Sequence, residues 1–417
     1  MFVPLNYTLR SLFVRKSATV LTILGIGATV AVLAGVLALR QGFHNLFVLG
    51  GRDDVAIFLR PGATSENQSY FRRELGDRLI KTLPEIASAG ASGVEGGAPL
   101  ASMETCLAVR RNRTGGRGET NVPIRGVQAA TFQIFPELRV AEGRRFNPGN
   151  DEVIVGRKLV ARIEDCELGD VIQLNTTPFK VVGIFDFDGP FSSEIWGDFE
   201  RMNAALDRDG PARIVARLRA DVVPDSPRPP QNKDGSFAGP MGPRRTAFEA
   251  FRARLELDKE TPATVMTDRE YLEKQTSLLS GVLMALSVFL SVVMGIAAIF
   301  TATNTMLAAV AGRTHEIGVL LSVGFRPIPI FLSFLFESIL LGLLGGLVGC
   351  LFALPLNGVE TGTTNWASFT EVAFAFRLTP GVLLAAVIFS LVLGLFGGTI
   401  PAWRAARLQP TEAMRRR

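Results

Sequence analysis

Four long apolar runs limit what this 417-residue chain can fold into more than any other feature. A helix needs about 20 apolar residues to cross the ~30 Å hydrocarbon core of a bilayer, and each run is that long. The runs cover residues 18–40, 276–303, 328–356 and 380–400. The sequence therefore predicts four transmembrane helices.

The first run has a second interpretation, because a basic segment before an apolar run is also typical of a secretory signal peptide. Arg15 and Lys16 precede the run. However, the run is longer than the usual apolar region of a signal peptide, and no small-residue cleavage site precedes Arg40. We therefore expect a retained helix, with residues 1–17 as a short N-terminal segment.

The composition indicates that a water-exposed domain accompanies these helices. Hydrophobic residues make up 47% of the chain and the mean hydropathy is +0.28. These values are high for a soluble protein and low for one that is embedded throughout. Residues 41–275, which separate the first two runs, explain the difference. We expect a large α+β domain inserted between the first and second transmembrane helices.

Basic residues gather beside the apolar runs. The net charge is +5, and the excess lies in residues 1–16, 311–327 and 401–417, which hold ten basic and two acidic residues. Such a distribution follows the positive-inside rule, so these segments are expected in the cytoplasm and the large domain outside. The excess is not evidence for nucleic-acid binding, because it flanks the membrane helices instead of forming a patch.

The loop at residues 311–327 predicts a short amphipathic helix. Ile317, Leu320 and Leu321 lie at spacings that place them on one face, beside a charged face. Such a helix between two membrane helices either binds a partner at the membrane surface or lies on the lipid headgroups. From the residues alone, these two alternatives are equally supported.

The end of this short helix is also predicted. Gly324 is expected to stop it, because glycine adopts the left-handed conformation that often follows a helix. Pro327 and Pro329 are then expected to prevent a new helix from starting before Ile330.

Glu337 is the one charged residue of the third run. A carboxylate at membrane depth is a candidate functional residue. The alternatives are that it reaches the headgroups or pairs with a base on the same or a partner chain, and we expect a mainly structural role. Beyond it, four glycines form a flat ridge that lets another helix approach closely, within one subunit or across a dimer. They are Gly342, Gly345, Gly346 and Gly349.

The large domain shows two separated strand–helix patterns. Residues 53–59 and 65–83 form the first, and residues 212–218 and 246–257 form the second, followed by a short strand at residues 263–266. A loop rich in Pro and Gly at residues 222–245 interrupts the second pattern. Between the two patterns, residues 95–205 are β-rich, with strands expected at residues 106–110, 122–127, 152–155, 171–174 and 179–185.

The sequence gives little support for a disulfide or a metal site in this domain. A disulfide between Cys106 and Cys166 is allowed outside the cytoplasm, but the spacing does not demand it. Asp186, Asp188 and Glu194 form a conceivable metal site, although a calcium loop needs a denser series of oxygen ligands. We expect a surface turn there.

The last part of the chain is expected to alternate between the two sides of the membrane. Residues 357–379 are polar and aromatic and predict an external loop. Pro401 is expected to end the fourth helix, and residues 401–417 then form a cytoplasmic tail.

Three motifs in this order resemble those of FtsX/MacB-type ABC transporter permeases. The family's NxM…RxxEIGxLxAxG segment is matched by NTMLAAVAGRTHEIGVLLSVGF, and its glycine-rich helix by ESILLGLLGGLVG. The closing PAxxAxxxxPxEALR is matched by PAWRAARLQPTEAMR. Together the motifs cover most of residues 276–417. His315 departs from the family, in which small or polar residues such as Arg or Lys are usual.

The resemblance implies a periplasmic domain with two subdomains. A porter subdomain would combine residues 50–93 and 211–270, and a sabre-like subdomain would comprise residues 94–210. The resemblance also implies a bacterial inner-membrane protein with both termini in the cytoplasm. The family supports a homodimer or a paired permease.

The resemblance further implies a separate ABC ATPase subunit that binds ATP and Mg²⁺. In the mechanotransmission type, ATP-driven closure of that subunit moves the loop at residues 311–327. The periplasmic domain then changes shape to export or extract a hydrophobic, lipid-linked or peptide cargo. A periplasmic adaptor and membrane lipids are further expected partners. The residues that map onto the ATPase contact are Arg313, Glu316, Ile317, Leu320 and Gly324.

Catalytic chemistry has little support in the sequence. The patterns GxxxxGK[ST], HExxH and GxSxG are absent, so neither a phosphate-binding loop nor a hydrolase motif is evident, and no cofactor is expected in this chain. The alternative function is a membrane-anchored periplasmic binding or sensor protein that acts without ATP. A membrane-bound hydrolase would need a nucleophile and base that we do not find.

Overall fold

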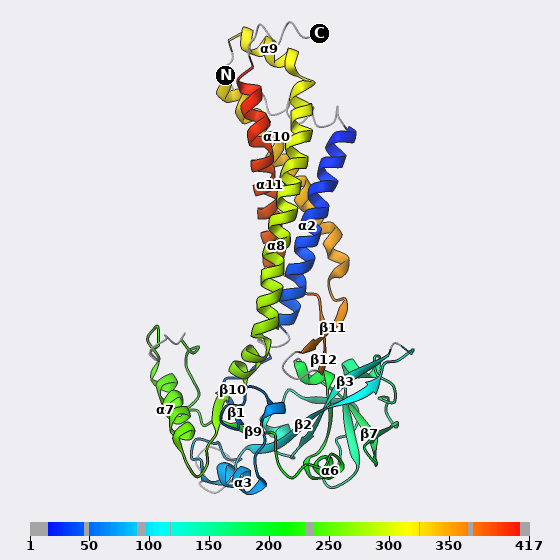
Figure 1. Cartoon of the computed structure of the whole chain (residues 1–417), viewed down its shortest axis with the longest axis vertical. Coiled ribbons are helices and arrows are strands. Elements are labelled where there is room, and N and C mark those ends of the chain that lie inside the picture. Colours follow the sequence, from blue (N-terminus) through cyan, green and yellow to red (C-terminus); the bar gives the residue numbers. More distant parts are fainter. Residues whose placement is uncertain are drawn as a thin grey trace. The chain divides into compact units, whose positions relative to one another are not determined.

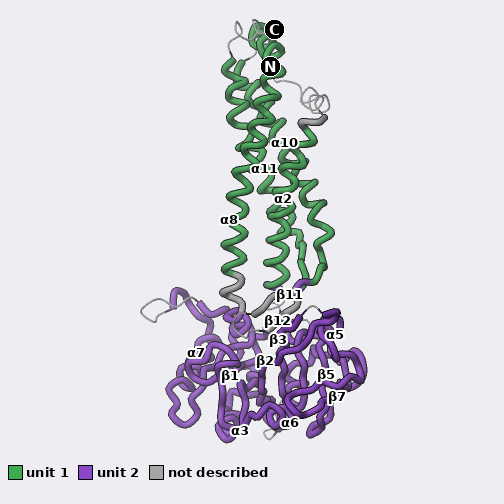
Figure 2. Tube along the Cα trace, turned by 45° about the vertical axis from the view of Figure 1, so that its right-hand side comes forward, with its two compact units in different colours: residues 1–43, 280–360, 375–417 green, residues 44–279, 361–374 purple. Residues whose placement is uncertain are grey.

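The structure is a computed structural model of the chain. It describes residues 16–45, 50–89, 97–116, 118–187, 189–229, 237–324, 326–365 and 370–408. The chain divides into two compact units, which are coloured separately in Figure 2. Unit 1 comprises residues 1–43, 280–360 and 375–417, and unit 2 comprises residues 44–279 and 361–374.

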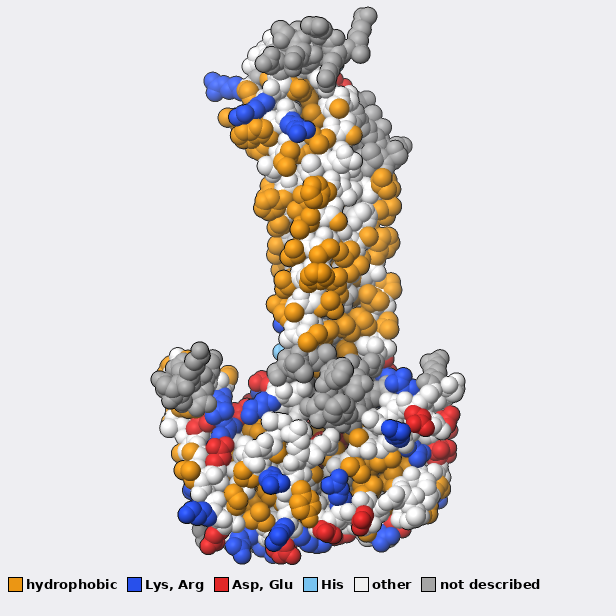
Figure 3. All heavy atoms as spheres, in the orientation of Figure 1, with side chains coloured by type: hydrophobic (Ala, Val, Ile, Leu, Met, Phe, Trp, Pro, Cys, Tyr) orange, Lys and Arg blue, Asp and Glu red, His pale blue; other side chains and the backbone are white. Residues whose placement is uncertain are grey.

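Unit 1 is built from long helices whose sides carry apolar side chains (Figures 1 and 3). Among the described residues, four helices are long and apolar enough to cross a membrane. They are α2 (Lys16–His44), α8 (Asp268–Ala311), α10 (Pro327–Ala353) and α11 (Pro380–Ala406). Two shorter helices, α9 (Thr314–Ser322) and the 3₁₀ helix η4 (Leu354–Leu356), follow α8 and α10. The predicted four-helix membrane part is confirmed.

One side of the glycine ridge on α10 packs against α11. A Cβ atom added to Gly342 would lie 2.6 Å from the carbonyl oxygen of Ser390, closer than any side chain tolerates. A Cβ atom at Gly346 would meet the Ser390 hydroxyl. On α11, Gly394 faces the backbone of Gly342 in the same way. The two helices therefore touch through their backbones.

The other side of the ridge packs against α2. A Cβ atom at Gly345 would lie 2.7 Å from the Ile26 side chain, and one at Gly349 would lie 2.6 Å from the Gly27 carbonyl oxygen. All four ridge glycines thus make close contacts inside one subunit. Of the two alternatives that the sequence left open, the structure shows the packing within one subunit.

The fourth membrane helix does not end at Pro401, contrary to our expectation. Helix α11 continues through Pro401 to Ala406. Proline in a helix interior lacks the N–H that would bond the carbonyl four residues earlier. That carbonyl belongs to Gly397, and it accepts a 3.0 Å hydrogen bond from the Thr303 hydroxyl of α8. The partner on a neighbouring helix satisfies the carbonyl, and the helix continues.

The start of α10 also differs from the prediction. We expected Pro327 and Pro329 to delay the helix until Ile330, but α10 begins at Pro327. The first turn of a helix has no intrahelical partners for its N–H groups, so proline costs little there and its fixed φ angle favours helix initiation.

Unit 2 is organised around a ten-stranded sheet, whose strands run in the order β10-β1-β9-β2-β3-β8-β5-β7-β4, with β6 paired to β7. The strands are β1 (Val55–Leu59), β2 (Ala101–Asn112), β3 (Glu119–Val127), β4 (Arg139–Gly143), β5 (Glu152–Gly156), β6 (Val171–Leu174), β7 (Thr177–Asp186), β8 (Ile195–Asp198), β9 (Arg213–Arg217) and β10 (Thr264–Thr267). The strands predicted in the β-rich region lie within β2, β3, β5, β6 and β7. The sequence analysis did not identify β4 and β8, which are only five and four residues long.

Strands from the beginning and the end of unit 2 are neighbours at one edge of this sheet. Strand β1 pairs antiparallel with β9 and also with β10, so that Ile57 lies opposite both Val215 and Met266. Helix α7 (Pro243–Leu257) packs beside this group through Phe248 and Phe251, which join the same apolar core as Phe58. The α+β character predicted for the domain is confirmed.

The first predicted helix of unit 2 is shorter than expected, whereas α7 begins three residues before the predicted residue 246. The segment at residues 65–83 contains only the 3₁₀ helix η2 (Glu66–Gln68) and the helix α3 (Arg73–Thr82). Phe71 lies between them, buried, with its N–H donated to the Pro211 carbonyl. The remaining helical pieces are α4 (Thr131–Ile134), α5 (Arg157–Val160), η3 (Pro190–Ser193) and α6 (Phe199–Ala205).

The segment at residues 186–196 is not the surface turn that we expected. Phe191 and Trp196 are buried, with their rings 5.3 Å apart, and β8 pairs in parallel with β3. Among the described residues, seven aromatic side chains in and around this segment form a connected set of ring contacts, and their burial outweighs the polarity of the segment's Asp and Ser residues. Asp188 lies outside the described residues.

Two further expectations are settled by the described residues. The polar segment after η4 is not a plain loop, because it contains the hairpin strands β11 (Glu360–Asn365) and β12 (Thr370–Ala375). Cys106 and Cys166 are both free and buried, so the disulfide alternative is not realised in this structure. Burial raises the pKa of the Cys166 thiol to about 12, which keeps it protonated and unreactive.

Replacing Gly349 with valine tests the helix packing. The added side chain meets the rigid backbone of α2, so we expect a loss of about 1–3 kcal/mol in stability, as for overpacked cores. Thermal unfolding of the detergent-solubilised chain measures this. Gly281→Val is the matched control, because nothing lies within 4 Å of a Cβ atom there. Equal melting temperatures for the two variants would contradict the packing described.

Candidate functional site

The site is the turn between α8 and α10, which contains α9. We call residues 312–326 the elbow; residue 325 lies outside the described part. Ile317 is 2% exposed and belongs to an apolar cluster with Phe334 of α10 and Ala402 of α11. Leu320 and Leu321 are half-buried. The apolar face predicted for the elbow helix therefore packs onto the transmembrane helices of unit 1.

A buried ion pair fixes the elbow to α10. Arg313 precedes α9, and its Nη1 atom lies 3.2 Å from Oε2 of Glu337. Both side chains are at most 10% exposed. Of the alternatives considered for Glu337, the structure shows pairing with a base on the same chain. Removing one member of a buried pair typically costs about 3–5 kcal/mol, because the other charge is left uncompensated.

The elbow helix ends where glycine allows it. Gly324 has a φ angle of +97°, in the left-handed region that residues with a Cβ rarely adopt. Its N–H donates to the Leu321 carbonyl, and the Val323 N–H donates to the Val319 carbonyl. Both bonds satisfy carbonyls that the end of the helix would leave open. The predicted helix stop at Gly324 is confirmed.

The other face of the elbow is exposed. His315 and Glu316 face outward, and Val319 and Val323 are 42% and 74% exposed. The five residues mapped from the family thus separate into two groups. The structure places Arg313 and Ile317 inside the bundle, whereas Glu316 and Gly324 are exposed and Leu320 is half-buried. Val319 and Val323 are exposed candidates that the sequence analysis missed, although their spacing opposite Ile317 already indicated it.

The first turns of α8 lie in unit 2 and are fixed there by polar contacts. Glu270 forms ion pairs with Arg245 and Arg252 of α7. The side chain of Asp268 accepts the N–H of Arg52 at 3.2 Å, and the Tyr271 hydroxyl accepts the N–H of Glu66. The helix that continues into the membrane part therefore begins within the fold of unit 2.

Beside this helix start lies a cluster of five buried charges from separate elements. Arg125 contacts Glu66 at 2.8 Å and Glu194 at 2.7 Å, and Arg213 contacts Glu104 at 2.7 Å. Burial alone would raise the pKa of Glu66, but Arg125 and Arg213 outweigh it and lower the pKa to about 2. The Glu66 carboxylate therefore stays charged and paired.

Glu194, one of the three residues of the conceivable metal site, belongs to this cluster. Glu194 binds Arg125 and accepts the indole N–H of Trp196 at 2.7 Å, so its oxygens already have partners. No group of three or more His, Cys, Asp or Glu side chains that could hold a metal occurs in the part of the chain that the structure describes.

Family models match most of the chain. The model of the MacB-like periplasmic core domain matches residues 19–226, and that of the FtsX-like permease C-terminal domain matches residues 288–410. The chain belongs to the MacB/FtsX-type family of ABC transporter permeases. The elbow lies within the FtsX-like part, and the buried charge cluster lies within the MacB-like part.

Relatives of known sequence agree with this assignment. The macrolide export ATP-binding/permease protein MacB of Bordetella avium is 26% identical over 430 residues, which are 99% of this chain and 60% of the relative. The ABC transporter permease YknZ of Bacillus subtilis is 24% identical, and the match covers 99% of this chain and 98% of YknZ. The chain thus spans about three fifths of the length of its MacB relative.

The periplasmic region of MacB from Actinobacillus actinomycetemcomitans matches 55% of this chain and 95% of that region. The TM-score is 0.35 and the sequence identity is 12%.

Replacing Arg125 with methionine tests the buried cluster of this MacB-like domain. The change leaves Glu66 and Glu194 without their main partner, so we expect a loss of about 3–5 kcal/mol in the stability of unit 2. Thermal unfolding of the full chain measures the effect. Arg73→Met is the control, because its partner Glu200 and Arg73 itself are both 49% exposed, and such pairs contribute about 0–1 kcal/mol. Similar losses in both variants would contradict the role of the cluster.

The buried carboxyl group of Asp268 predicts that the stability of the folded chain depends on pH. Burial raises its pKa to about 6, so the folded state holds this proton more tightly than the unfolded chain does. Stability is therefore lost as the pH rises from about 4 through 6. Asp268→Asn imitates the protonated form, and we expect it to raise stability by about 2–3 kcal/mol at pH 7.5 and to change little at pH 4.

Melting temperatures of the variant and the original chain at both pH values measure this difference. Asp221→Asn is the control, since Asp221 is 60% exposed and forms a surface ion pair with Arg219. A gain from Asp268→Asn that is equal at both pH values would show that the Asp268 carboxylate does not titrate in this window.

Proposed function

We propose that this chain is the permease subunit of an ABC transporter of the mechanotransmission type. A separate ATPase subunit, which carries ATP and Mg²⁺, would bind the exposed face of the elbow. One observation carries this proposal: the elbow has a buried face fixed to α10 and an outward face that combines Glu316 with Val319 and Val323. Apolar side chains flanked by charge are typical of a protein contact surface.

The buried face supports the transfer of force. Arg313 and Ile317 link the elbow to α10, so a push on its outer face moves the elbow together with that helix. A loop lying loosely on headgroups would need neither a buried ion pair nor a buried isoleucine. This supports the partner-binding alternative for residues 311–327.

The continuity of α8 supports a path toward the large domain. The helix is unbroken from Asp268 to Ala311, and Glu270 and Tyr271 fix its first turns in unit 2. A movement of its membrane part would therefore act on residues that hold the α7 and β1 region together. We propose that the large domain responds with a change of shape.

The setting and the cargo are part of the proposal. The Bordetella relative is named for macrolide export, and we propose that this chain exports or extracts a hydrophobic, lipid-linked or peptide cargo. We also propose an inner-membrane protein with cytoplasmic termini, paired with a second permease copy and assisted by a periplasmic adaptor. Because the α10 glycine ridge is occupied within the subunit, the pairing would use another surface.

Substitutions on the outer face of the elbow test the proposal. An affinity-tagged chain in mild detergent is expected to retain an ATPase with a phosphate-binding loop. Glu316→Arg and Val319→Asp leave the buried face intact, and we expect each to reduce the recovered ATPase about tenfold, which corresponds to about 1.4 kcal/mol of binding energy. Mass spectrometry and ATP hydrolysis of the eluate measure the recovery.

Leu257→Asp is the matched control, because Leu257 is 83% exposed but lies in unit 2. It should retain the ATPase fully. Retention by the elbow variants would show that the ATPase binds elsewhere. Absence of an ATPase from the original chain would favour the membrane-anchored binding or sensor protein.

A further inference from the structure

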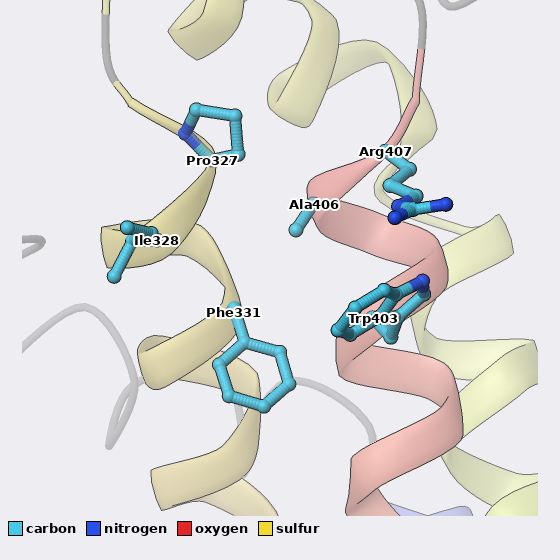
Figure 4. A pocket seen from close by; sticks show the side chains of 6 residues that line it. All are labelled: Pro327, Ile328, Phe331, Trp403, Ala406 and Arg407. Carbon is cyan, nitrogen blue, oxygen red and sulfur yellow. The ribbon is translucent and has the colours of Figure 1, made fainter.

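An open apolar groove of about 240 Å³ lies between the start of α10 and the end of α11. Figure 4 shows Phe331 on α10 and Trp403 on α11 at its two sides. Its lining residues are Pro327, Ile328, Phe331, Trp403, Ala406 and Arg407. Neither the elbow contacts nor the helix packing described above uses this groove.

The groove is apolar and accessible from outside the bundle. Ile328 is 68% exposed and Trp403 is 53% exposed. Both residues lie within one turn or so of the end of a membrane helix, where the hydrocarbon meets the headgroups. Tryptophan is enriched at this level of the bilayer, because its ring is apolar and its N–H is polar. A lipid acyl chain is therefore chemically suited to the groove.

The rim of the groove is cationic. The Arg407 guanidinium lies 4.5 Å from the centroid of the Trp403 ring, a cation–π contact that holds it at the edge of the groove. Arg404 lies on the same last turn of α11, and residues 380–408 contain no Asp or Glu. A guanidinium matches the geometry of a phosphate through two parallel hydrogen bonds. The rim thus favours a ligand with net negative charge.

We propose that this groove binds an anionic phospholipid of the surrounding leaflet. One acyl chain lies between Phe331 and Trp403, and the headgroup phosphate binds Arg407. A zwitterionic lipid fits the apolar part of the groove equally well, but the positive charge of its headgroup is repelled by Arg407. The inference goes beyond the proposed transport function and does not depend on an ATPase, so either one can fail without the other.

Quenching of Trp403 fluorescence tests the proposal with the full chain reconstituted in phosphatidylcholine vesicles. The probes are dibrominated phosphatidylglycerol and dibrominated phosphatidylcholine at equal mole fractions. The fluorescence of Trp403 is obtained by subtracting the fluorescence of the Trp403→Phe variant from that of the original chain. We expect brominated phosphatidylglycerol to be preferred about fivefold, the effect of one Arg near anionic lipid.

Two variants that each remove one positive charge distinguish a specific lipid site from a general attraction of anionic lipids to the protein surface. Arg407→Gln should abolish the preference, whereas Arg404→Gln should retain it, because Arg404 does not line the groove. Equal quenching by both brominated lipids would overturn the proposal. So would an equal loss in the two variants, since it would report only diffuse surface charge. A disulfide between two copies of Ile328→Cys would also overturn it, because a second chain would then occupy the groove.

Discussion

The membrane part of this protein depends on one electrostatic constraint: a charge placed among apolar helices must have a partner. Glu337 lies in the third membrane helix, and Arg313 supplies that partner from the entrance of the elbow. The pair is costly to bury, but once buried it is costly to break from either side. The elbow is therefore fixed to α10 by a contact with defined geometry, whereas apolar contacts alone would allow it to slide. A defined position is what a partner at the membrane surface would require.

Unit 2 uses the same rule on a larger scale. Two of its buried arginines, Arg125 and Arg213, bring together carboxylates from η2, β2 and the segment before β8, beside the start of α8. Buried ion pairs add little to stability when compared with a well-packed apolar core. Their contribution here is to specify which elements meet. Because α8 also begins among buried charges, its position in unit 2 is determined by directional bonds as well as by packing.

The sequence predicted features that depend on local composition and missed those that depend on contacts with distant residues. Run length predicted the four helices, the conformational freedom of glycine predicted the stop at Gly324, and its lack of a side chain predicted the close packing on α10. The continuation of α11 through Pro401 could not be predicted, because it depends on the Thr303 hydroxyl of another helix. In the elbow, spacing predicted an apolar face but did not tell whether that face meets a partner or its own subunit. The buried role of Glu194 was missed because its partner Arg125 lies on another strand.

The pairing of β1 has a consequence for how the protein is made. Strand β1 lies near the start of the large domain, yet its two neighbours in the sheet, β9 and β10, are synthesised last. Until residue 217 has crossed the membrane, β1 has no strand to pair with and Glu66 lacks Arg213, and the second neighbour β10 is complete only at residue 267. Folding dominated by such distant pairings is slow and exposes unpaired edges. Export of nearly the whole domain must therefore precede its folding, and the emerging chain would need protection from proteases and aggregation during that interval.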